Sequence, residues 1–156
     1  MNSLDDIIDW YRTIETLIKT AENGGMEIYD LSVNPPQVFD KTKKKIDEIT
    51  VVYLWSAFEP LVYRHLESIS DKIIISQPSD FYKRIIEYRT KEIDRWRMTE
   101  IIELYRSFIP VSIIEQTKKI YNYRNWVAHG KSEKENILLT PSYVHSVLVE
   151  FVEYLK

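Results

Sequence analysis

The segment from Ile49 to Phe58 constrains the fold most, because its residues would be apolar on nearly every side of a helix. A helix with only one apolar face can lie on the surface of a protein, whereas a helix that is apolar all round must be covered on several sides. This segment is therefore expected to be a central helix. The rest of the chain must supply the elements that surround it.

Helical patterns also occur on both sides of this segment. Residues 4–22 place apolar side chains three and four positions apart, after Ser3 as an N-cap. Residues 141–155 repeat that spacing after Thr140 as N-cap and Pro141 at the first helical position. Further helical segments are expected at residues 39–69, from Ser79 onward, at 98–108, and from a capping box at Ser112–Glu115 to the stop at Gly130.

No segment alternates as a strand would, and no internal repeat is visible. The sequence therefore predicts an all-α fold. We expect a four-helix up-and-down bundle with one or two short additional helices, formed by a single domain over residues 1–156.

Composition narrows the functional classes. The chain has no cysteine, which excludes disulfides, thiolate zinc sites and a cysteine nucleophile. Its three histidines are far apart, so we expect no metal site and no cofactor: His65, His129 and His145. The net charge of −3 argues against a globally basic nucleic-acid binder but allows a local basic patch. With no signal-peptide pattern and no membrane-spanning apolar run, a cytoplasmic protein is expected.

Polar chemistry is concentrated at the end of the penultimate predicted helix. Arg124, Asn125 and His129 lie within six residues, and Gly130 follows as a helix terminator. One explanation is structural, since basic side chains are common in the last turn of a helix and Asn125 could bond a neighbouring loop. The other is catalytic. Asn125 and His129 share a helix face, whereas Arg124 lies about 140° from His129 on an unbroken helix.

If these groups converge, they could cleave RNA without a metal. An imidazole can exchange protons near neutral pH, and a guanidinium can clamp a phosphate. A base would remove the 2′-OH proton, the 2′-oxygen would attack phosphorus, and the cation would stabilise the transition state. A single histidine cannot easily act as both base and acid. A two-fold homodimer would solve this by presenting two copies of the motif across one cleft.

The segment Arg124–His129, with the sequence Arg-Asn-Trp-Val-Ala-His, resembles the Arg-x4-His motif of the HEPN superfamily. These are small all-helical proteins, many of them metal-independent ribonucleases. The segment Trp55–Glu59 is similar to the part of the family's second core helix that carries an acidic residue. The resemblance implies a HEPN-like homodimer with an RNA cleft, acting in toxin–antitoxin or antiviral defence, with an antitoxin protein as a partner. It implies Arg124, Asn125 and His129 as site residues, with Glu59 orienting the arginine or the histidine.

Three lysines are candidate RNA contacts: Lys118, Lys119 and Lys131. Lys131 stands where family toxins paired with a nucleotidyltransferase antitoxin often have a tyrosine. A second hypothesis is a non-catalytic HEPN-like module that binds RNA, a nucleotide or a partner protein, with Arg124 and His129 binding without reacting. Nearby aromatic residues fit both hypotheses, through packing or base stacking: Tyr121, Tyr123 and Trp126.

Overall fold

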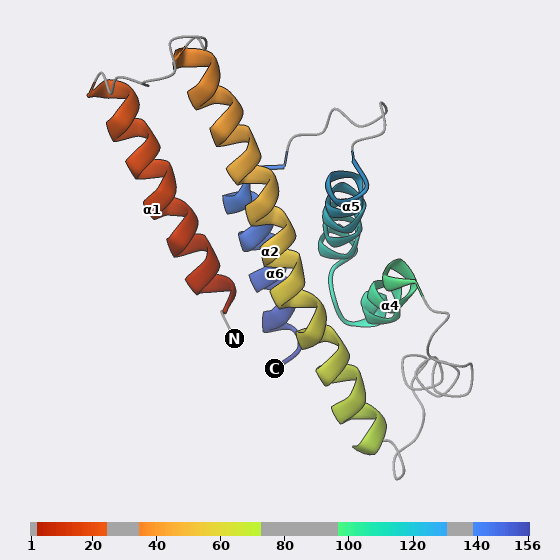
Figure 1. Cartoon of the computed structure of the whole chain (residues 1–156). Helices are drawn as coiled ribbons and strands as arrows, with labels where there is room; N and C mark the ends of the chain where they lie inside the picture. Colours follow the sequence, from red (N-terminus) through yellow and green to blue (C-terminus); the bar gives the residue numbers. More distant parts are fainter. Residues whose placement is uncertain (1–2, 25–34, 73–96, 131–138) are drawn as a thin grey trace.

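The computed structural model describes residues 3–24, 35–72, 97–130 and 139–156. All regular structure in these ranges is helical, which confirms the predicted all-α class (Figure 1). The predicted helical segment that begins at Ser79 lies outside the described residues. The elements are α1 (Leu4–Asn23), α2 (Pro35–Lys72), α4 (Met98–Leu104), the 3-10 turn η2 (Tyr105–Ser107), α5 (Val111–Ala128) and α6 (Pro141–Glu153).

α2 is the central helix of the bundle. It contacts α1, α5 and α6, and its side chains Leu54, Trp55 and Phe58 are fully buried. The Trp55 ring lies 5.3 Å from that of Tyr121 on α5, and the Phe58 ring lies 5.2 Å from that of Phe151 on α6. The prediction that this segment is covered on several sides is therefore confirmed. In the described ranges, no helix is long and apolar enough to cross a membrane.

Of the three predicted N-terminal caps that lie in the described residues, two are present in the structure. Ser3 and Asp6 form a capping box at the start of α1, and Thr140 caps α6. The hydrogen bonds from the backbone and side chain of Ser3 lower the pKa of the Asp6 carboxyl. The predicted capping box at Ser112 is wrong, because α5 begins earlier, with Pro110 as its N-cap. Glu115, which that box requires, instead accepts a hydrogen bond from Arg106 at 2.5 Å.

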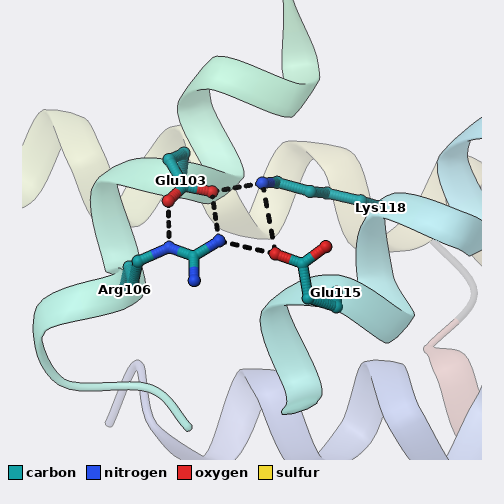
Figure 2. A network of polar contacts seen from close by, with 4 residues as sticks. All are labelled: Glu103, Arg106, Glu115 and Lys118. Atoms are coloured by element: carbon teal, nitrogen blue, oxygen red, sulfur yellow. Dashed lines mark hydrogen bonds and ion pairs between the residues drawn. The ribbon is translucent and has the colours of Figure 1, made fainter. Parts of the chain in front are cut away.

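A network of four charged side chains joins α4 and η2 to α5 (Figure 2). Arg106 donates from Nη2 to Glu103 at 3.0 Å and to Glu115 at 2.5 Å, and its Nε also donates to Glu103. Lys118 donates to Glu103 and lies 3.6 Å from the Glu115 carboxylate. The network therefore pairs two cations with two carboxylates across the turn that leads into α5.

This network predicts a dependence of stability on acid. The hydrogen bonds from Arg106, together with the bond and charge of Lys118, lower the pKa of Glu103 from 4.5 to about 2. A carboxyl group whose pKa is lower in the folded state than in the unfolded state stabilises the folded protein at any pH above its unfolded-state pKa. This stabilisation is lost as the pH falls toward the folded-state pKa. Because Glu103 is about a third exposed, solvent screens these interactions. We expect them to contribute only about 1–2 kcal/mol to the free energy of unfolding at neutral pH.

Urea unfolding of the wild type and of Glu103→Gln checks this expectation. The wild type should be more stable at pH 7, and the difference should shrink as the pH is lowered from about 4.5 to about 2. The same difference at neutral and strongly acidic pH would contradict the assignment.

Candidate functional site

Arg124 points toward the interior of the bundle near the end of α5. Helical periodicity places it between buried positions of the same helix, and its side chain is half-buried. Those buried positions are Ile113, Thr117 and Ile120. Arg124 Nη1 donates to Asn125 Oδ1 at 2.9 Å, so the structure brings these two predicted site residues together.

The Nε atom of Arg124 is shielded from solvent and has no hydrogen-bond partner within the described ranges. A buried donor without a partner costs about 1–3 kcal/mol, so its presence calls for an explanation. Because Arg124 as a whole is only half-buried, other nitrogens of its planar guanidinium can still donate to an anion at the surface.

His129 follows α5 as its C-cap, and its side chain is exposed. Its backbone N–H donates to the Asn125 carbonyl at 2.9 Å, so the helix is intact up to this residue. Gly130 has a φ of 84°, a left-handed conformation that favours glycine. The predicted termination of the helix at Gly130 is therefore confirmed. Because the helix does not unwind before His129, the histidine and Arg124 leave α5 in different directions.

Glu48 on α2 is a buried carboxylate that the sequence analysis did not single out. Only 1% of the residue is exposed. Burial raises the pKa of the Tyr123 hydroxyl, and the charges of Glu48 and Asp47 raise it further. Glu48 therefore lies at the level of Tyr123, the residue before Arg124. The sequence signal was its position seven residues before Trp55, which places both side chains on the edge of α2 that faces α5.

Asp47 connects this end of α2 to α1. The Tyr11 hydroxyl donates to Asp47 Oδ1 at 2.9 Å. Burial raises the pKa of the Asp47 carboxyl, and burial together with the Asp47 carboxylate raises that of Tyr11. The start of α2 thus places two neighbouring carboxylates near the end of α5, one bonded to α1 and one on the side of α5.

Glu59, the acidic residue that the resemblance implies, lies further along α2 than Glu48. Glu59 follows Glu48 by eleven residues, which is about 16 Å along a helix axis. Since α2 and α5 run in opposite directions (Figure 1), Glu59 lies toward the beginning of α5. It is half-buried there.

The lysine candidates lie in different surroundings. Lys118 is paired with Glu103 and Glu115 in the network of Figure 2, about 16 Å along α5 from His129. Lys119 is exposed and makes no ion pair within the described part of the chain. Lys131 lies outside the described residues.

Of the aromatic candidates, Tyr121 packs on Trp55. Tyr123 is buried, with its ring 5.6 Å from that of Trp126. Tyr123 is therefore part of the internal packing, whereas Tyr121 and Trp126 are half-buried residues that pack against the core. In the described ranges, no three histidine, aspartate or glutamate side chains are grouped in a way that could hold a metal ion.

Comparison of the chain with protein-family models, curated proteins and solved structures finds no significant match. The resemblance of residues 124–129 to the HEPN motif therefore stays a prediction.

Proposed function

We propose that this protein is a metal-independent endoribonuclease of HEPN type, which cleaves RNA in the cleft of a homodimer. The proposal includes a HEPN-like bundle in which α1, α2, α5 and α6 are the main helices and α4 is additional. The observation that carries it is the half-buried guanidinium of Arg124, which is bonded to Asn125 and lies five residues before an exposed His129.

In the proposed reaction, one imidazole removes the proton of a ribose 2′-OH, and the 2′-oxygen forms a bond to the adjacent phosphorus. The bond between phosphorus and the 5′-oxygen breaks, and a second imidazole protonates that leaving oxygen. The products are a 2′,3′-cyclic phosphate and a 5′-hydroxyl. His129 supplies one imidazole, and the copy of this residue in the other subunit supplies the second.

The neighbouring groups support this chemistry. Arg124 stabilises the negative charge that develops on the phosphate oxygens. Asn125 accepts a hydrogen bond from Arg124 and leaves its amide donors to position a ribose or phosphate. We infer that the charge of Glu48, which is buried on α2 at the level of Tyr123, helps to orient the guanidinium. An RNA-cleaving protein harms its own cell unless it is controlled, so a role in toxin–antitoxin or antiviral defence, with an antitoxin as partner, belongs to the same proposal.

One observation favours a non-catalytic RNA-binding module instead. Within the described ranges, no hydrogen bond orients the imidazole of His129, although a catalytic base is usually held by a second group. In the homodimer, the second subunit would supply that constraint. Turnover therefore distinguishes the two functions.

The proposed activity is tested by incubating the purified protein with single-stranded RNA in EDTA and identifying the product ends. Cleavage that leaves 2′,3′-cyclic phosphates supports the proposal. Intact RNA under these conditions, with binding retained, supports the non-catalytic module. Cleavage that occurs only after a divalent metal is added contradicts the proposed chemistry.

The two candidate acidic residues give a second prediction. Glu48→Gln should lower the rate of RNA cleavage about ten- to a hundredfold, because a misplaced guanidinium loses its alignment with the phosphate. Glu59→Gln should change the rate by less than about twofold, since Glu59 lies about 16 Å further along α2. Single-turnover cleavage by both variants at equal concentration measures the difference. The opposite order of effects would restore Glu59 as the orienting residue.

A further inference from the structure

Four lysines gather in the first turns of α2, in a chain whose net charge is −3. All four are exposed: Lys41, Lys43, Lys44 and Lys45. Within the described residues, only Lys43 approaches a carboxylate, with Nζ 3.9 Å from Glu15. Other basic side chains of the described bundle do have close ionic partners, such as Lys19 with Glu15 at 3.0 Å. The start of α2 thus presents three lysines that no ion pair among the described residues neutralises: Lys41, Lys44 and Lys45.

At least one of these lysines lies close to the part of α5 that carries Arg124 and His129. α2 begins at the end of the bundle where α5 ends (Figure 1). Lys44 lines a cavity of about 240 Å³ together with Tyr123, the residue before Arg124. Lys41 and Lys45 precede Glu48 by seven and three residues, which places them on the same edge of α2, facing α5.

Acidic groups around the lysines offset part of this charge. Asp40 and Asp47 line the same cavity. Asp47 accepts the hydroxyl of Tyr11 on α1, and Glu48 is buried beneath the surface. Two lysines, Lys43 and Lys44, and two carboxylates line the cavity, and the exposed Lys41 and Lys45 add positive charge beside it. An extended polyanion fits this face better than a single ion, because the lysines follow one another along the helix.

We propose that Lys41, Lys44 and Lys45 bind the phosphate backbone of RNA and guide the strand toward Arg124 and His129. The inference rests on the proposed ribonuclease function, whose site it extends onto α2. It assigns the RNA path to the start of α2, while Lys118 stays in its ion-pair network. Each lysine that neutralises a phosphate releases a counterion, so binding should weaken as salt is added.

The test measures binding of a fluorescent single-stranded RNA of about 20 nucleotides by anisotropy at several KCl concentrations. All proteins carry His129→Ala, so the RNA is not consumed. Adding Lys41→Ala, Lys44→Ala and Lys45→Ala together should raise Kd at least about tenfold at moderate salt. It should also reduce the slope of log Kd against log salt by about 2, at about 0.7 for each lost contact with a single strand. Lys19→Ala on α1, already paired with Glu15, is the matched control and should change neither quantity.

The outcomes separate this inference from the proposed function. If the wild type cleaves RNA and the triple variant keeps its affinity and slope, the lysine site is overturned and the ribonuclease stands. If no RNA is cleaved but binding depends on the three lysines, the RNA path stands and the catalytic proposal fails. Binding of polyglutamate, but not of RNA, would overturn the inference and assign this face to an acidic protein.

Discussion

Replacing His129 with alanine is expected to lower the rate of RNA cleavage by about 10²- to 10⁴-fold, the usual contribution of general acid–base catalysis. The loss should be specific to the reaction, because the side chain is exposed and the backbone N–H that closes α5 is kept in the variant. The helical circular dichroism spectrum and the Tm should therefore match those of the wild type. Single-turnover kinetics with excess enzyme would measure the chemical step.

His145→Ala is the matched control. His145 lies on α6, where its Nε2 is 3.0 Å from Asp5. Its removal should leave the cleavage rate within about twofold, because it takes away a histidine outside the proposed site. Full activity in His129→Ala, or an equal loss in both variants, would contradict the assignment of His129.

Arg124→Ala is expected to lower the cleavage rate by about 10²- to 10³-fold, the typical cost of removing a group that stabilises transition-state charge. Arg124→Lys should recover little of this loss, because an ammonium lacks the planar fork of a guanidinium. The free energy of unfolding should change by less than about 1 kcal/mol, because the substitution also removes a buried donor without a partner in the described structure.

Arg64→Ala serves as the control for Arg124. Arg64 is exposed on α2, and its Nε donates to the Pro60 carbonyl at 3.2 Å. Cleavage by this variant should be unchanged. If Arg124→Ala unfolds the protein or leaves cleavage intact, Arg124 is a structural residue of α5 and has no role in the reaction.

The central part of the fold could be predicted from the sequence because its signals are local. An all-round apolar run marks Ile49–Phe58 as the covered helix, and Ser3 with Asp6 marks the start of α1. The start of α5 could not be predicted in the same way. The residue pattern at Ser112 fits a capping box, but Arg106, from another element, competes for Glu115.

In the candidate site too, the local features could be predicted from the sequence, and the features that depend on helix packing could not. The position of Arg124 and His129 at the end of a helix, and the stop at Gly130, followed from neighbouring residues. The choice between Glu48 and Glu59 depends on how α2 and α5 are aligned, which packing such as that of Trp55 on Tyr121 fixes. Sequence spacing within one helix contains no information on that alignment. For the same reason, the pairing of Lys118 with Glu103 was not predicted.

The most direct test of a catalytic site shared by two subunits is the activity of mixed dimers. Wild-type and His129→Ala subunits would be unfolded together, refolded at equal concentration, and assayed for RNA cleavage in EDTA. If each reaction requires both imidazoles, only dimers with two wild-type subunits cleave, and about one quarter of the wild-type rate is expected. A rate of about one half would mean that each subunit acts alone, and an absence of cleavage by the wild type itself would contradict the proposed ribonuclease.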